Sequence, residues 1–212
     1  MSDPLPPLAL PPLRVTCTST DCAHDLHCFK RSKRAAKPHL EGKCRDCGVG
    51  IVDWPRVQMR DVGDVAFTFQ SLRNELIRHH YWHVEIPQRL VENARRRGQA
   101  KLRAATLRRI RSSVGSLPNA YDGRQTPAVG SPKANIVHYG QHAVAACCRK
   151  CIEYWHGLER DRALSEQEVT YLAELTYLYV VERLPFLTAR GEKIARVRKA
   201  AASEIQQMKR TG

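Results

Sequence analysis

The chain has 212 residues, with 35 Lys and Arg against 21 Asp and Glu, which gives a formal net charge of +14. Apolar residues make up 42% of the chain, so full disorder is excluded, and no apolar run approaches the roughly 18 residues of a membrane span. The surplus of positive charge favours nucleic acid as a partner, because neutralising phosphates is the commonest use of such a surplus. A membrane surface is less favoured as a partner, because the sequence has no basic amphipathic helix with bulky aromatic residues on its other face.

Residues 1–14 form a leader rich in Pro and Leu, which we expect to be flexible. Asp3 stands where a secretory signal needs basic residues, and the prolines interrupt the apolar run, so no export signal is predicted. We therefore expect a cytoplasmic protein with reduced thiols. In that compartment, clustered cysteines are typical of metal ligands rather than of disulfides.

Residues 15–58 are predicted to form a small loop-rich zinc module, because this segment is too short and polar to bury a large core. Cys44 and Cys47, followed by Gly48, have the spacing of a zinc knuckle, in which two thiolates clasp one ion. Because the module has more candidate ligands than positions, a closed structural site is favoured. The second pair must come from upstream, where three arrangements stay open: Cys17 with Cys22, Cys22 with Cys28, or His24 or His27 in place of one sulfur.

Residues 59–114 are predicted to be helical. From about Val65, apolar residues recur at helical spacing, and Pro87 ends this stretch. A second helical stretch follows as far as Ser112, and we expect Gly98 to divide it in two.

Basic side chains are concentrated in two segments of the first half. The arginine fork matches phosphate geometry, so these segments are the candidate nucleic-acid contacts, although a charge run on a helix is often only solvated. Helical positions distribute the second segment's charges around the axis rather than along one stripe. The candidates are Lys30, Arg31, Lys33 and Arg34 in the first segment, and Arg95, Arg96, Arg97, Lys101, Arg103, Arg108 and Arg109 in the second.

Three histidines, His79, His80 and His83, lie in the first helical stretch. His79 and His83 are one turn apart, which suits two ligands of one ion. The same spacing also places them beside Leu72 and Leu76 as hydrogen-bonded core residues, and periodicity does not separate the two interpretations.

Residues 115–212 are expected to hold a second cluster of cysteines and histidines, followed by two helices. Ile136–Tyr139 is predicted to be a short strand. Ser165 and Glu168 form a capping-box pattern at the start of a helix that Pro185 ends, and a last helix is expected after it. The whole chain is thus predicted to be mainly α-helical, with a small loop-rich zinc-binding module and few short strands.

The second cluster brings five possible ligands into fifteen residues: His142, Cys147, Cys148, Cys151 and His156. On one continuous helix the cysteines span about 100° of one face, while both histidines lie near the opposite face. A site of two histidines with Cys148 and Cys151 therefore requires a helix that starts near Cys148, or a loop that holds His142. The alternatives are three thiols lining a core, or an iron–sulfur cluster without a standard ferredoxin spacing.

Two motifs stand out in this region. The first is Asp-Gly-Arg-Gln-Thr-Pro at 122–127, and the second runs over 141–157 through Cys-Cys-Arg-Lys-Cys to Trp-His-Gly. Together they resemble the motifs of a bacterial and phage domain family of unknown function. The resemblance covers about residues 119–185 and implies no reaction. It implies that these residues act together: Asp122, Gln125, His142, Cys147, Cys148, Arg149, Cys151, Trp155 and His156.

Three functions stay open. The leading hypothesis is a nucleic-acid-binding protein in which two zinc ions, rather than a large apolar interior, organise both ends of the chain. The second is a metal-dependent hydrolase such as a nuclease, in which an ion in the second cluster activates water with help from Asp122, Gln125 or His138. The third is an adaptor whose basic surface binds an acidic protein partner.

Overall fold

The computed structural model describes residues 15–30, 42–116 and 126–194, and this part of the chain is mainly helical, as predicted. It contains the α-helices α1 (Trp54–Gln58), α2 (Val65–Leu72), α3 (Leu76–His83), α4 (Gln88–Ile110), α5 (Ile136–Ala143), α6 (Arg149–His156) and α7 (Glu166–Arg183). Short 3-10 turns, η1 (Cys22–His24) and η3 (Val62–Asp64), and a π-helical turn, η4 (Arg111–Gly115), complete the elements. Pairing of β type within these ranges is limited to two isolated bridges, Asp21 with Leu26 and His27 with Glu75.

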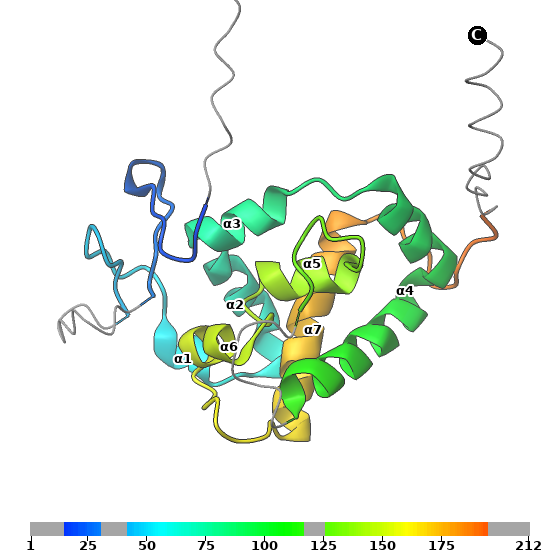
Figure 1. Ribbon diagram of the computed structural model, residues 1–212. Helices are drawn as coiled ribbons and strands as arrows, with labels where there is room; N and C mark the ends of the chain where they lie inside the picture. Colours follow the sequence, from blue (N-terminus) through cyan, green and yellow to red (C-terminus); the bar gives the residue numbers. More distant parts are fainter. Residues whose placement is uncertain (1–14, 31–41, 117–125, 195–212) are drawn as a thin grey trace, which may run out of the picture.

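Helix α7 runs through the middle of the bundle, and α2, α4 and α5 pack against it (Figure 1). Its start carries the predicted capping box: Glu168 N donates to Ser165 Oγ at 3.2 Å, and Ser165 N donates to Glu168 Oε2 at 2.8 Å. A helix buried on most sides is typical of a central element. The buried positions are Val169, Tyr171, Leu172, Ala173, Leu175, Thr176, Tyr179 and Val180.

The helical stretch predicted from about Val65 is divided into α2 and α3. The break occurs because the N-terminal module pairs with the backbone between the two helices. His27 N donates to Asn74 O at 2.8 Å, and Leu76 N donates to His27 O at 2.9 Å. These bonds hold the dark blue segment of Figure 1 against the start of α3.

Gly98 divides α4, as predicted, with φ 71° and ψ 169°. A Cβ at this position would lie 2.5 Å from the backbone carbonyl carbon of Arg190, so the close approach of the two segments requires glycine. In place of helical partners, Gln99 N and Ala100 N donate to carbonyls at 188 and 189, at 2.9 and 3.3 Å. The kink also interrupts the helical register between the basic residues before and after it.

The strand predicted at Ile136–Tyr139 is wrong, because these residues begin α5. Asn135 Oδ1 accepts from the backbone N–H groups of Val137 and His138, at 2.9 and 3.2 Å, and Asn135 N donates to His138 Nδ1 at 3.1 Å. This reciprocal capping, together with burial of the helix, outweighs the strand preference of Ile136 and Val137.

An extensive apolar core lies between the helices, and it includes the surroundings of the second cysteine cluster. Leu72, Ile152, Trp155 and Leu172 are completely buried. The expectation that metal rather than apolar burial organises both ends of the chain is therefore wrong for the C-terminal half. No helix in the described part combines the length and the apolar character that a bilayer crossing requires.

Several predicted features lie outside the described residues. They are the leader at 1–14, the last helix beyond residue 194, and the site candidates Arg31, Lys33, Arg34, Asp122 and Gln125.

Candidate metal centres and basic cleft

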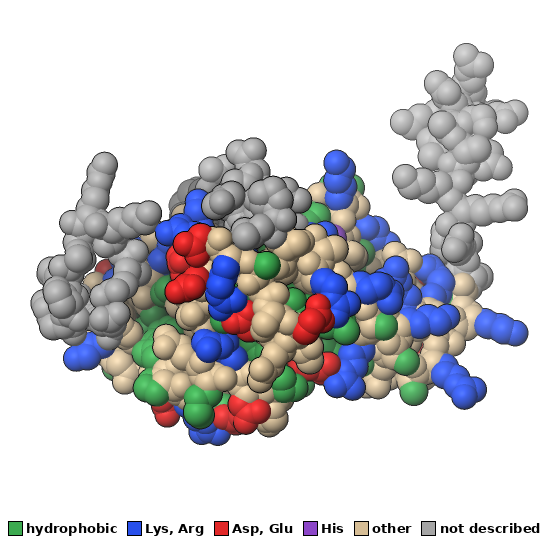
Figure 2. Space-filling view, turned by 90° about the horizontal axis from the view of Figure 1, so that it is seen from below, with side chains coloured by type: hydrophobic (Ala, Val, Ile, Leu, Met, Phe, Trp, Pro, Cys, Tyr) green, Lys and Arg blue, Asp and Glu red, His purple; other side chains and the backbone are tan. Residues whose placement is uncertain are grey.

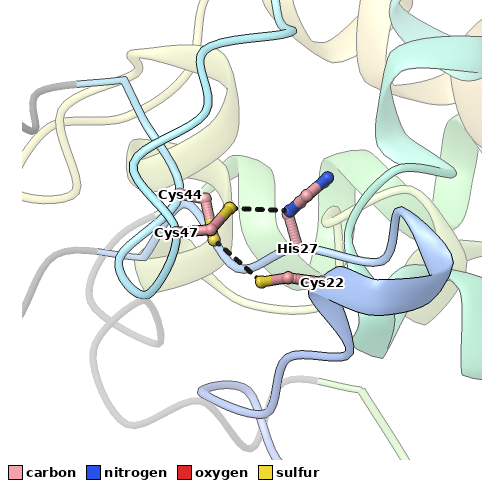
Figure 3. Close-up of side chains that lie close together, drawn as sticks. All are labelled: Cys22, His27, Cys44 and Cys47. Carbon is pink, nitrogen blue, oxygen red and sulfur yellow. Dashed lines mark hydrogen bonds between the residues drawn. The ribbon is translucent and has the colours of Figure 1, made fainter.

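Four side chains of the N-terminal module come together in one group: Cys22, His27, Cys44 and Cys47 (Figure 3). One ligand atom from each lies within 4.8 Å of all the others. Cys22 Sγ is 3.7 Å from Cys44 Sγ, and Cys47 Sγ is 3.5 Å from His27 Nδ1. Three sulfurs and one imidazole nitrogen are a donor set of closed, four-coordinate structural sites, so this group can hold a metal ion.

A tight turn shapes the downstream half of this group. Gly48 has φ +77°, and its N–H donates to Cys44 O at 3.0 Å, while Cys44 N donates to Val49 O at 2.7 Å. Burial opposes ionisation of the Cys44 thiol, but backbone amides, the first from Cys28 and the next from Cys47, outweigh it and lower the pKa of Cys44 to about 6. Backbone amides of Cys28 and of the turn together thus favour the thiolate of Cys44, which is the form that binds metal.

The upstream half of the group comes from a loop that closes on itself. Asp21 N donates to Leu26 O at 2.7 Å, and Leu26 N donates back to Asp21 O at 3.1 Å. This pairing brings Cys22 and His27 to the same side as the turn. Among the arrangements that the sequence left open, the structure brings together the one in which His27 replaces a sulfur.

The other predicted ligands of this module lie outside the group. Cys28 is buried, and its Sγ donates to Cys17 O at 3.4 Å. His24 lies on the surface, where its Nδ1 is 2.9 Å from Asp21 Oδ1. Cys17 and Cys28 therefore take no part in the first group.

The second group consists of Cys147, Cys148 and Cys151, whose sulfurs all lie within 4.8 Å of one another. Cys148 is the N-cap residue of α6, and Cys151 lies in the first turn of that helix. Helix α6 thus starts next to Cys148, as a site that uses both Cys148 and Cys151 required. Three thiols can hold a metal ion, and in a tetrahedral site they leave one position for a fourth donor.

The histidines predicted for this site are engaged elsewhere. His156 is completely buried, with its Nδ1 3.1 Å from Tyr171 Oη and its Nε2 3.1 Å from Val144 O. Burial lowers the pKa of His156 to about 4, so it is a neutral core residue. His142 Nε2 lies 3.1 Å from Pro127 O. The predicted set of two histidines and two cysteines is therefore not brought together.

A buried ion pair joins the second group to the N-terminal half of the chain. Arg78 Nη2 donates to Cys151 Sγ at 3.4 Å, and Arg78 Nε donates to Glu75 Oε2 at 3.0 Å. Glu75 also accepts from Tyr154 Oη at 2.9 Å and from Trp155 Nε1 at 2.6 Å. Sequence reasoning missed Arg78, because a single arginine in a helical stretch carries no motif that marks it as buried.

The remaining histidine candidates have structural surroundings. His138 is buried and serves as the capping partner at the start of α5; burial, followed by the nearby charge of Arg109, lowers its pKa to about 4. The rings of His79 and His83 lie 4.2 Å apart between centroids. Within the described ranges, His79, His80 and His83 join no group of three possible ligands.

Ion pairs engage part of the predicted nucleic-acid set on α4. The pairs are Arg95 with Glu192 at 2.6 Å, Arg96 with Glu92 at 3.1 Å, and Arg103 with Glu174 at 2.8 Å. Arg109 is partly buried and contacts Gln141 Oε1 at 3.3 Å. Arg97, Lys101 and Arg108 are exposed, and the described chain places no acidic group in an ion pair with them. These three cations are available to an external anion.

A cleft of about 690 Å³ opens between the first half of α4 and the start of α5. Three arginines line it, Arg89, Arg96 and Arg97, and its one acidic side chain is Glu92. In Figure 2, Lys and Arg side chains gather at the end of the molecule where α4 lies. The cleft is therefore positive, and its shape and charge suit an anionic ligand.

Residues 66–181 match the family described as "Domain of unknown function (DUF4186)", which is more than half of the chain. No solved structure matches the chain. The matched region contains the second cysteine group and the basic cleft, whereas the first group lies before it. The predicted membership of a family of unknown function is confirmed at this level, and the bacterial or phage origin stays a prediction.

Proposed function

This chain belongs to the DUF4186 family, and we propose that it is a zinc-stabilised protein that binds nucleic acid through the cleft between α4 and α5. The metal has the structural role, and the arginines of the cleft contact phosphates. The cleft carries the proposal, because it combines a size suited to a ligand with a lining of three arginines against one glutamate, and Arg97 among them is exposed.

Zinc is the metal that the donor chemistry favours. Thiolates and imidazole are its usual structural ligands, and the set of Cys22, His27, Cys44 and Cys47 fills all four positions of a tetrahedral site. The module around them is poor in apolar residues, so the bound ion would supply the stability that a small loop-rich segment lacks.

The cleft offers more than one source of positive potential. Arg97 is exposed at its rim, and Lys101 and Arg108 continue along α4 beyond it. The first residues of α5 line the opposite wall, where Asn135 caps the backbone amides of Val137 and His138. A phosphate backbone laid along α4 would therefore meet the cleft first and the two further cations next.

A salt titration of binding tests this proposal. The variant Arg97→Gln/Lys101→Gln removes two exposed cations of α4. The matched control Lys43→Gln/Lys150→Gln removes two exposed cations outside α4, for which the described residues likewise show no ion pair. Each lost phosphate contact lowers the slope of log affinity against log salt by about 1, so the first variant should lose about 2 and the control almost nothing.

Two results would overturn the proposal. One is an affinity for single- and double-stranded DNA and RNA that does not change with salt. The other is an equal loss in both variants, which would assign the binding to net charge rather than to the cleft. Binding only to an acidic protein would favour the adaptor hypothesis instead.

A further inference from the structure

The second cysteine group lacks a fourth ligand within its own segment. Cys147, Cys148 and Cys151 present three sulfurs within 4.8 Å, while a structural zinc site has four ligands. His156 has both ring nitrogens engaged in the core. A fourth donor has to come from another part of the chain or from solvent.

Cys17 is the thiol that the first group leaves unused. The four positions of that group are filled by Cys22, His27, Cys44 and Cys47. Cys17 is half-buried, and its carbonyl accepts the Cys28 thiol at 3.4 Å. Cys28 follows His27, which pairs with the backbone of Asn74 and Leu76. The contact with Cys28 therefore holds Cys17 near the start of α3.

Contacts of neighbouring residues place the Cys17 segment beside the second group, although the Cys17 sulfur is not among those within 4.8 Å of one another. The Phe29 ring, next to Cys28 in the chain, packs edge-on against the Trp155 ring of α6, with centroids 6.0 Å apart. Arg78 contacts Cys151 Sγ directly, at 3.4 Å. In Figure 1 the dark blue segment runs beside the start of α3.

We propose that Cys17 is the fourth ligand of a four-thiolate zinc site with Cys147, Cys148 and Cys151. The bound ion joins the N-terminal module to the start of α6, so the ligands of the two sites interleave along the chain. This inference rests on the zinc part of the proposed function and not on nucleic-acid binding.

Arg78 completes the electrostatics of this site. Four thiolates around a divalent ion carry a net charge of −2, and the buried guanidinium offsets part of it while donating an N–H to a ligand sulfur. The ion pair with Glu75 holds Arg78 in the orientation that this contact needs. The negative charge of a four-thiolate site thus explains why Arg78 is buried beside these cysteines.

Metal content of purified full-length variants tests the assignment. Wild type should bind two zinc ions per chain, one for each group. Cys17→Ser should retain one ion, and Cys28→Ser, a matched control at a neighbouring buried thiol, should retain two. Cys28 belongs to neither group, and its Sγ donates to Cys17 O at 3.4 Å. Cobalt substitution should show weaker sulfur-to-metal charge transfer in Cys17→His than in wild type.

Two outcomes would overturn the assignment. The first is a Cys17→Ser protein that keeps two ions with an unchanged cobalt spectrum; the second is loss of the second ion in His142→Gln but not in Cys17→Ser. Alkylation of the zinc-loaded wild type needs no variant: Cys17 should be protected together with Cys147, Cys148 and Cys151, and selective labelling of Cys17 would contradict the proposal. Nucleic-acid binding is not measured in any of these experiments, so the two proposals fail separately.

Discussion

Replacing Glu75 with Gln should destabilise the folded protein strongly, because it removes the charge that pairs with a buried arginine. Glu75 and Arg78 are 1% and 2% exposed, and their side chains are 3.0 Å apart. Gln has nearly the same shape, so packing against Tyr154 and Trp155 is kept. Breaking a buried pair by removing one partner costs about 3–5 kcal/mol, since it leaves an uncompensated charge.

Urea unfolding of the zinc-loaded proteins, followed by circular dichroism, would measure this loss. Arg103→Gln is the control, because it breaks the pair with Glu174 in which Arg103 is 62% exposed. An exposed pair contributes about 0–1 kcal/mol, so the control should unfold near the wild-type midpoint. A loss below about 1 kcal/mol in Glu75→Gln would refute the reasoning, since it would mean that Glu75 is uncharged in the folded state.

Three further outcomes are expected. Burial lowers the pKa of His138 to about 4 in the folded protein, against about 6.5 in the unfolded chain, so the unfolded state takes up the proton first and stability falls as the pH drops from 6.5 to 4. His138→Gln keeps the acceptor for Asn135 N and should make the urea midpoint depend less on pH over this range. An unchanged pH dependence of the midpoint would contradict this expectation. Gly98→Ala should lower the melting temperature more than Gly130→Ala, because both have positive φ but only the first would push a Cβ to 2.5 Å from Arg190; equal losses would exclude the close approach as the cause. Cys44→Ser should lose one zinc ion and expose residues 15–58 to limited proteolysis while 66–181 stays protected, whereas equal cleavage of both regions would show that they unfold together.

Local features of the chain were predictable because their signals lie within a few residues. The Ser165–Glu168 capping box, the apolar positions of α7 and the division of α4 at Gly98 all follow from short-range backbone chemistry. The spacing of Cys44 and Cys47 likewise identified a turn that directs two sulfurs to one point.

Contacts between distant segments decided what the sequence left open. The break between α2 and α3 depends on pairing with His27, about fifty residues earlier, and the sequence carries no sign of that partner. The same pairing places His27, rather than Cys17 or Cys28, among the ligands of the first group.

The sequence by itself determined that this is a basic, mainly helical chain with two thiol-rich segments, because composition, periodicity and ligand spacing are properties of neighbouring residues. Only the tertiary structure decided which thiols share a centre, which arginines are paired and that Arg78 is buried beside sulfur. The physical reason is that coordination and ion pairing require atoms within a few ångströms, and here the folding of α3 against α6 creates that proximity.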